Sequence, residues 1–235
     1  MEVLVVVPTY NEADNLPRLA RALLDLPLDL GILVVDDASP DGTGRLAEDL
    51  AARDRRVMVL HRPGKQGLGT AYVQGFSWGL AHTPARLFAQ MDADFSHHPR
   101  RLPALVEVAR RGVVAVGSRY VAGGGVRNWS LGRRLLSRGG SLYARLVLGL
   151  PLHDVTGGFK CWPRRVLEDI DLPAVHSNGY AFQAEMSYRA HRRGHRLVEV
   201  PIVFEDRRVG RSKMSAAIAL EALWLVWRLR LGLGG

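Results

Sequence analysis

The sequence is poor in cysteine, in aromatic residues and in long uninterrupted apolar runs, and each shortage narrows the possible classes of protein. Cys161 is the single cysteine, so no internal disulfide can form and we expect a reducing compartment. Only 7% of the residues are aromatic, which is few for a nucleic-acid surface built from stacking rings. The chain passes from Met1 directly into a β-branched run without a basic leader, so we expect no signal peptide.

The charge, by contrast, is one-sided. Lysine and arginine total 32 against 23 acidic residues, and the net charge is +9, carried almost entirely by arginine. Such an excess predicts an anionic partner, which is a phosphorylated substrate, an acidic membrane surface or a nucleic acid. The few aromatics, together with carboxylates at predicted strand ends that would repel phosphate unless a metal intervened, argue against nucleic acid.

The first half of the chain alternates short β-branched runs with helical periodicity. We expect strands over residues 3–7, 32–35, 57–60, 87–91 and 113–116. We expect helices over residues 14–26, 44–53, 68–81 and 102–111. This alternation predicts a Rossmann-like α/β domain with a mostly parallel sheet flanked by helices on both faces. Ligands of such sheets bind beyond the carboxyl ends of the strands.

The second half has a different character. A glycine-rich loop over residues 121–130 leads into a basic, apolar helix over residues 131–148. A further helix over 182–193, a strand over 196–204 and an apolar helix over 215–231 are expected to follow. We therefore predict one domain over residues 1–213, with a nucleotide-sugar half (1–120) and an acceptor half (121–213), and an apolar C-terminal helix over 214–235.

The strongest chemical signal follows the fourth predicted strand, in Asp92-Ala93-Asp94. Side chains two residues apart in a strand point to the same side, so Asp92 and Asp94 can converge on one hard cation. Two carboxylates with diphosphate oxygens suit Mg²⁺ or Mn²⁺. The plain alternative is a helix cap and a solvated aspartate. For His97 and His98 we favour packing or orientation over metal ligation.

Two other strand ends carry polar residues. After the first strand the G-x-G-x-x-G motif is absent, which argues against a dinucleotide site. Tyr10 there can stack on a base and Glu12 can accept hydrogen bonds, although the segment can also be an ordinary loop. The second strand ends in adjacent carboxylates, Asp36 and Asp37, and one of them can accept hydrogen bonds from a nucleoside.

Arginine and lysine fall at two further places where a phosphate could bind. Arg119 ends the fifth strand, where its planar fork can pair with a phosphate, or it is simply a surface arginine. The basic segment over 206–213 is either a link to the last helix or a flap over a diphosphate. The glycines of residues 67–69 lack the spacing of a P-loop, so we do not expect an ATPase.

Taken together, these segments resemble family 2 glycosyltransferases of the GT-A fold, and within them the dolichol-phosphate or polyprenol-phosphate mannose synthases. The matching pieces lie in order over nearly the whole chain. They are Pro8-Thr9-Tyr10-Asn11-Glu12, Asp36-Asp37-Ala38-Ser39-Pro40-Asp41-Gly42-Thr43, Gly67-Leu68-Gly69-Thr70-Ala71-Tyr72, Asp92-Ala93-Asp94-Phe95-Ser96-His97-His98-Pro99, Gly117-Ser118-Arg119-Tyr120, Thr156-Gly157-Gly158-Phe159-Lys160, Gly179-Tyr180-Ala181-Phe182-Gln183 and Ser212-Lys213.

The resemblance implies a role for each matching residue. The residues implied to line a guanosine pocket are Pro8, Tyr10, Glu12, Val35 and Asp37. Those implied to meet the ribose, diphosphate and sugar of the donor are Asp92, Ala93, Asp94, Arg119, Arg207 and Lys213. Asp92 and Asp94 would hold the metal, Asp94 and Arg119 would be catalytic, and Arg119, Arg133 and Ser137 would receive the acceptor phosphate. Ser96 stands where some relatives have glutamine, which leaves a third protein ligand of the metal open.

The implied reaction is inverting transfer of mannose from GDP-mannose to a polyprenyl (dolichyl-type) phosphate. The phosphate is already ionised near pH 7, so no general base is needed, and Glu185 is expected to be structural. The alternative is another nucleotide sugar with a lipid phosphate.

The same resemblance implies a place at the membrane. We expect a cytoplasmic protein bound peripherally to the cytoplasmic face, with a membrane-embedded partner subunit as an open alternative. Glu221, Arg228 and Arg230 leave the C-terminal apolar run too short to span a bilayer.

Overall fold

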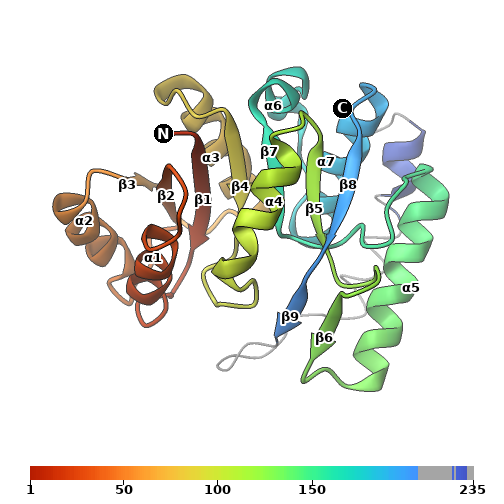
Figure 1. Cartoon of the computed structure of the whole chain (residues 1–235), viewed down its shortest axis with the longest axis horizontal. Coiled ribbons are helices and arrows are strands. Elements are labelled where there is room, and N and C mark those ends of the chain that lie inside the picture. Colours follow the sequence, from red (N-terminus) through yellow and green to blue (C-terminus); the bar gives the residue numbers. More distant parts are fainter. Residues whose placement is uncertain (206–223, 225, 232–235) are drawn as a thin grey trace.

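The computed structural model describes residues 1–205, 224 and 226–231, without the side chain of Tyr180. A seven-stranded sheet in the order β3-β2-β1-β4-β7-β5-β8 forms its centre (Figure 1). Every pairing is parallel except those of β7, which runs antiparallel to β4 and β5. The strands are β1 (Val3–Thr9), β2 (Leu30–Asp36), β3 (Val57–His61), β4 (Leu87–Gln90), β5 (Val114–Ser118), β7 (Lys160–Pro163) and β8 (Leu197–Pro201).

Helices cover both faces of the sheet. They are α1 (Leu16–Leu24), α2 (Thr43–Arg53), α3 (Leu68–His82), α4 (Leu102–Ala109), α5 (Leu131–Leu148), α6 (Arg164–Asp169) and α7 (Gly179–Arg192), with short 3₁₀ turns η1 (Pro99–Arg101) and η2 (Leu172–Ala174). Alternation along β1 divides the core, because Leu4 and Val6 pack with residues of α3 and α7, whereas Val3, Val5 and Val7 pack with α1 and α4.

The close approach of α3 to β1 explains two of its glycines. A Cβ on Gly75 would lie 2.5 Å from Val6 Cγ1, and one on Gly79 would lie 2.4 Å from Leu4 Cδ2. Larger residues would push the helix away from the sheet. This packing fixes the start of α3 beside the carboxyl ends of β1 and β2.

The predicted α/β class, the mostly parallel sheet and the order of its elements are confirmed. Two predictions need correction. The strand expected over 196–204 is two strands, because β8 pairs with β5 whereas β9 (Val203–Glu205) pairs with β6 (Gly125–Arg127) in a second, two-stranded sheet. The antiparallel strand β7 was not predicted; it brings the second half of the chain into the central sheet.

The two apolar helices predicted in the second half have different outcomes. Helix α5 has the predicted bounds and stands at the edge of the molecule remote from α1 and α2 (Figure 1). Most of the helix expected over 215–231 lies outside the described residues. In the described part, Trp224 and residues 226–230 are helical. No helix among the described residues has the length and apolar character that a bilayer crossing requires.

Candidate active site

A cleft of about 290 Å³ opens where β1, β2 and β4 end. Its walls come from the loops after these strands and from the start of α3. Seven of the residues predicted for the donor site line it together: Pro8, Tyr10, Glu12, Asp37, Asp92, Ala93 and Asp94. Parallel strands bring their carboxyl ends to one edge, so segments far apart in sequence meet there.

The other four predicted donor residues are not among the described residues that line this cleft. The side chain of Val35 is fully buried under α3, 3.0 Å from where a Cβ on Gly75 would stand, because alternation along β2 turns it into the core. Its role in the guanosine pocket stays a prediction, and the buried side chain leaves only the backbone of Val35 to fulfil it. Arg207 and Lys213 fall outside the described residues. Arg119 does not line this cleft but belongs to a second cluster described below.

The adjacent carboxylates at the end of β2, Asp36 and Asp37, have different roles. Asp36 accepts hydrogen bonds from Thr9 Oγ1 (2.9 Å) and from Ser39 Oγ (2.6 Å), so it fixes the turn. Asp37 faces the cleft and is paired with the buried guanidinium of Arg62, which also donates to Thr70 Oγ1 at 2.7 Å. Burial raises the pKa of Asp37, and Arg62 opposes that rise. Arg62 was not among the predicted residues.

Neighbours hold the carboxylate pair after β4 in place. Tyr72 donates its hydroxyl to Asp92 Oδ1 at 3.2 Å, and the Ser96 N–H donates to Asp94 Oδ1 at 3.0 Å. Burial, reinforced by Asp92, raises the pKa of Tyr72 well above its usual value, so the phenol stays a donor. Tyr72 was part of a quoted motif, but no role had been predicted for it.

His97 lies behind the carboxylates and packs there, as the sequence suggested. Its ring stacks on Phe159 with centroids 5.1 Å apart, and its Nδ1 receives the Asp92 N–H at 3.5 Å. Burial lowers the pKa of His97, which favours the neutral ring. The side chain therefore orients the turn rather than facing the cleft.

The oxygen atoms that this turn offers as metal ligands suit a hard divalent cation. Asp92 and Asp94 both line the cleft, and Ser96 Oγ is buried without a hydrogen-bond partner among the described residues. Among the described residues, no group of three or more His, Cys, Asp or Glu side chains is arranged so that it could hold a metal ion by itself. A cation held here would therefore take its remaining ligands from substrate oxygens and water, as Mg²⁺ commonly does.

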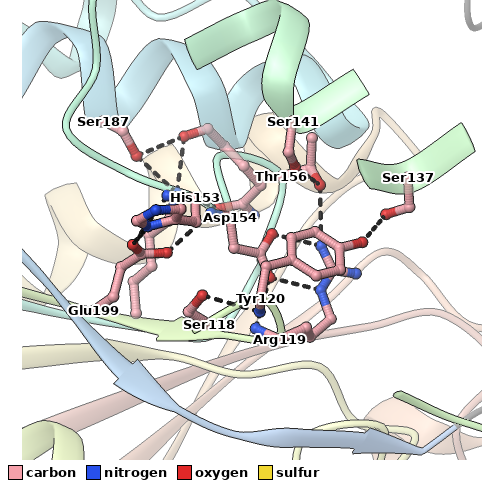
Figure 2. Close-up of polar contacts among 12 residues, drawn as sticks. Ser118, Arg119, Tyr120, Ser137, Ser141, His153, Asp154, Thr156, Ser187 and Glu199 are labelled. Atoms are coloured by element: carbon pink, nitrogen blue, oxygen red, sulfur yellow. Dashed lines mark hydrogen bonds and ion pairs between the residues drawn. The ribbon is translucent and has the colours of Figure 1, made fainter. Parts of the chain in front are cut away.

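A second cluster surrounds Arg119 at the end of β5 (Figure 2). Its Nε and Nη2 donate to the two oxygens of the wholly buried Asp154 at 2.7 and 2.6 Å. Nη2 also donates to Thr156 Oγ1 (3.0 Å), which in turn lies 3.2 Å from Ser141 Oγ on α5. Glu199 accepts the backbone N–H of Asp154 at 2.9 Å, so β8 fixes the residue that orients Arg119. Asp154 had not been predicted.

The structure brings the other two predicted acceptor residues to the same place. The Arg133 guanidinium lies 4.2 Å from the ring centroid of Trp129, and that of Arg119 lies 5.4 Å from the same ring. Ser137 Oγ accepts a hydrogen bond from Tyr120 at 2.7 Å, next in sequence to Arg119. Arg119, Arg133 and Ser137 are thus neighbours, although Arg119 follows β5 and the other two belong to α5.

A chain of rings joins the two clusters. Phe204 on β9 lies 5.5 Å from the His97 ring and 5.4 Å from the Trp129 ring, centroid to centroid. His97 contacts the carboxylate turn, and Trp129 contacts both arginines. A carboxylate pair suited to a metal and an arginine pair suited to an anion therefore flank one phenylalanine.

Glu185, the one candidate for a general base, is structural as expected. It is buried, accepts both the N–H and the hydroxyl of Ser177, and pairs with Arg189 at 2.7 Å. It lines no part of the cleft.

The fold and the two clusters define a Rossmann-like α/β protein with a metal-suited carboxylate pair at the sheet edge and an anion site beside it. Comparison with known sequences identifies the class. Residues 4–171 match the profile of glycosyl transferase family 2, so the chain belongs to glycosyltransferase family 2. The resemblance drawn from the motifs is confirmed.

Two curated relatives extend over nearly the whole chain. It is 47% identical over 244 residues to the undecaprenyl-phosphate mannosyltransferase of Micrococcus luteus, covering 99% of this chain and all of the relative. It is 48% identical over 231 residues to the polyprenol monophosphomannose synthase of Mycolicibacterium smegmatis, covering 97% and 87% respectively.

A solved structure of similar fold is glucosyl-3-phosphoglycerate synthase of Mycobacterium tuberculosis in complex with Mn²⁺, UDP and glucosyl-3-phosphoglycerate. The TM-score is 0.67, with 98% of this chain and 80% of that one covered. At 19% identity, the likeness concerns the fold alone.

Proposed function

We propose that the protein transfers mannose from GDP-mannose to a polyprenyl phosphate, with inversion at the anomeric carbon. The single observation that carries the proposal is that the carboxylate cleft and the arginine pair flank Phe204. One side suits a nucleoside diphosphate with its cation, and the other suits a phosphate monoester. The two relatives, named for mannosyl transfer to polyprenyl phosphates, support this choice of substrates.

On the donor side, Tyr10 and Asp37 stand at the cleft, where a base and its polar edge would bind. Asp92 and Asp94 would hold Mg²⁺ or Mn²⁺ against the diphosphate. When bound, the cation neutralises the charge that develops on the departing GDP. Structural neighbours solved in complex with Mn²⁺ or Mg²⁺ and UDP support the use of a divalent cation.

On the acceptor side, the attacking group is the phosphate oxygen of the lipid. A phosphate monoester with a second pKa near 6 is largely ionised at neutral pH, so the site needs no base. Arg119, oriented by Asp154, and Arg133 would place this oxygen for in-line attack. Catalysis then comes from positioning two anions and neutralising their charge.

The outer face of α5 supports a place at the membrane surface. Leu131, Leu135, Leu142 and Leu146 share one side of the helix and are all more than half exposed. Arg134, Arg138 and Arg145 lie alongside this stripe, where they can reach anionic head groups. We propose that this stripe, the leucine stripe of α5, rests in the lipid interface and brings the acceptor phosphate to Arg133.

Product analysis tests the proposed reaction. Purified protein, Mn²⁺ and a short polyprenyl phosphate are incubated with GDP-mannose, UDP-glucose or UDP-N-acetylglucosamine, and the lipid products are weighed by mass spectrometry. We expect one added hexose with GDP-mannose and none in the presence of EDTA. Transfer from a UDP-sugar alone, or full transfer in EDTA, would refute the donor or the metal.

Vesicle flotation tests the membrane contact. We expect the protein to float with vesicles that contain phosphatidylglycerol, and Leu135→Glu with Leu142→Glu to abolish flotation. Ala52→Glu with Ala81→Glu is the matched control, since it adds the same charge to exposed positions of α2 and α3. Equal flotation of both double variants would contradict the role of the leucine stripe.

A further inference from the structure

The structure assigns a third donor to the acceptor phosphate, the indole N–H of Trp129. We infer that Trp129 Nε1 donates a hydrogen bond to the phosphate bound between Arg119 and Arg133. The inference rests on the proposed function, because the phosphate monoester of the lipid is the ligand it names.

The first observation is a buried N–H that has no acceptor in the described part of the chain. Trp129 is only 8% exposed, and within residues 1–205, 224 and 226–231 no atom forms a hydrogen bond with its Nε1. A buried indole N–H ordinarily has a partner, and leaving it without one costs free energy. The buried Trp162 follows that rule, since its N–H donates to Gln90 Oε1 at 2.8 Å.

The second observation is the chemistry of the groups around this ring. The two guanidiniums lie 4.2 and 5.4 Å from the ring centroid, and the ring of Phe204 meets it edge-on. Guanidinium groups only donate hydrogen bonds, and so does the indole. These groups cannot accept the indole N–H, whereas an anion placed beside them can.

The third observation is the position of Trp129 in the chain. It immediately precedes Ser130, the N-cap of α5, whose Oγ accepts the Arg133 N–H at 3.3 Å. The positive end of the helix dipole therefore lies at the same point and favours an anion there. Trp129 also contacts Phe204, which separates the arginine pair from the carboxylate turn. A phosphate held by Trp129 is thus on the acceptor side of that ring.

The wild-type protein provides the direct test. The chain has five tryptophans, so labelling the indole nitrogens with ¹⁵N gives five N–H resonances, and the one missing from Trp129→Phe belongs to Trp129. We expect farnesyl phosphate to shift this resonance downfield and slow its exchange with solvent. Farnesol and GDP with Mn²⁺ leave it in place. Inorganic phosphate shifts it only at much higher concentration, which separates the lipid phosphate from a free ion.

Kinetics of matched variants give the second test. Trp129→Phe keeps a ring beside the arginines but loses the donor, so the KM for farnesyl phosphate should rise roughly ten- to hundredfold, as for a hydrogen bond to a charged group. GDP affinity and the melting temperature should not fall, because the lost N–H has no partner among the described residues. Trp129→His, which retains a ring N–H, should recover part of the acceptor affinity.

Trp162→Phe is the control. It makes the same substitution at a tryptophan whose indole N–H already donates a hydrogen bond within the protein. It should lower the melting temperature and leave the KM for farnesyl phosphate unaltered. The inference fails if the Trp129 resonance ignores farnesyl phosphate while the enzyme turns over, or if Trp129→Phe keeps the wild-type acceptor KM. If the wild type transfers to no lipid phosphate and no indole responds to one, the proposed function itself fails.

Discussion

The cleft and helix α5 differ in how their side chains are held. In the cleft, neighbouring elements fix the carboxylates: Arg62 pairs with Asp37, and Tyr72 donates to Asp92. In α5, only three of eighteen residues are buried, and they face Arg119 and the core. The outer side of the helix exposes the leucine stripe.

This difference shows which part of the chemistry each region can supply. A carboxylate pair held by neighbours is preorganised for a metal and a diphosphate before the substrate arrives. Exposed leucines on a helix instead suit a ligand that brings its own apolar surroundings, as a polyprenyl chain in a bilayer does. Substitutions in the cleft should therefore damage the chemistry itself, whereas those on α5 should damage access to the acceptor.

The largest effect is expected from Asp94→Asn in the cleft. The loss of one metal-suited charge should lower the rate of transfer roughly a thousandfold, or by about 4 kcal/mol of transition-state stabilisation. Initial rates with Mn²⁺ measure it, and the melting temperature shows that the fold survives. Asp49→Asn, at an exposed position of α2, is the control. A rate within tenfold of the wild type would remove Asp94 from the catalytic residues.

Arg133→Ala on α5 should have the next largest effect, and on the other substrate. Removing a charged donor should raise the KM for a short polyprenyl phosphate roughly ten- to hundredfold while GDP binding stays the same. Steady-state kinetics and thermal shifts with GDP and Mn²⁺ measure the two quantities. Arg53→Ala, at an exposed position of α2, is the control. Equal weakening of donor and acceptor would show that the two regions are not separate.

Tyr72→Phe tests whether the cleft depends on a residue behind the metal ligands. It removes the hydroxyl that donates to Asp92 Oδ1. Partners of metal ligands affect metal affinity, so we expect the Mn²⁺ concentration for half-maximal activity to rise about tenfold. Tyr188→Phe removes a hydroxyl from another buried tyrosine and should leave that concentration unaltered. An unaltered Mn²⁺ requirement in Tyr72→Phe would mean that this hydrogen bond is only structural.

The last prediction concerns the stability of the sheet that both regions share, rather than catalysis. Burial lowers the pKa of Lys160 from near 10.5 to about 7. Between these values the unfolded chain binds more protons than the folded one, so the free energy of unfolding rises with pH, by roughly 1 kcal/mol per unit. Lys160→Met should lack this rise, and Lys65→Met, at an exposed lysine, should keep it. Denaturant unfolding at pH 7 to 10 measures it, and parallel curves for wild type and Lys160→Met would contradict the buried titration.

The sequence alone predicted the features that depend on local patterns and missed those that depend on contacts between distant segments. Strand–helix alternation predicted the sheet, and the rule of strand ends predicted that Asp37, Asp92 and Asp94 meet, because both patterns are local. Arg62 was missed because its partner, Asp37, lies 25 residues earlier and the pairing depends on how β2 and β3 end. The antiparallel strand β7 has only four residues, too few to show a period.

Two further contacts were not predicted, because each joins residues that lie apart in the sequence. Asp154 pairs with Arg119 across 35 residues of sequence, and the indole of Trp129 contacts the same arginine. No spacing in the sequence encodes these contacts. The motifs gave the residues that we propose to touch substrates, whereas the residues that orient them became visible only in the folded chain.

The most direct test of the account is a crossed binding experiment on Asp94→Asn and Arg133→Ala. Calorimetry measures GDP with Mn²⁺ and farnesyl phosphate separately on each variant and on the wild type. We predict that Asp94→Asn loses the Mn²⁺-dependent binding of GDP and keeps farnesyl phosphate, whereas Arg133→Ala loses farnesyl phosphate and keeps GDP. Parallel losses of both ligands in both variants would contradict the division of the site into a donor cleft and an acceptor helix.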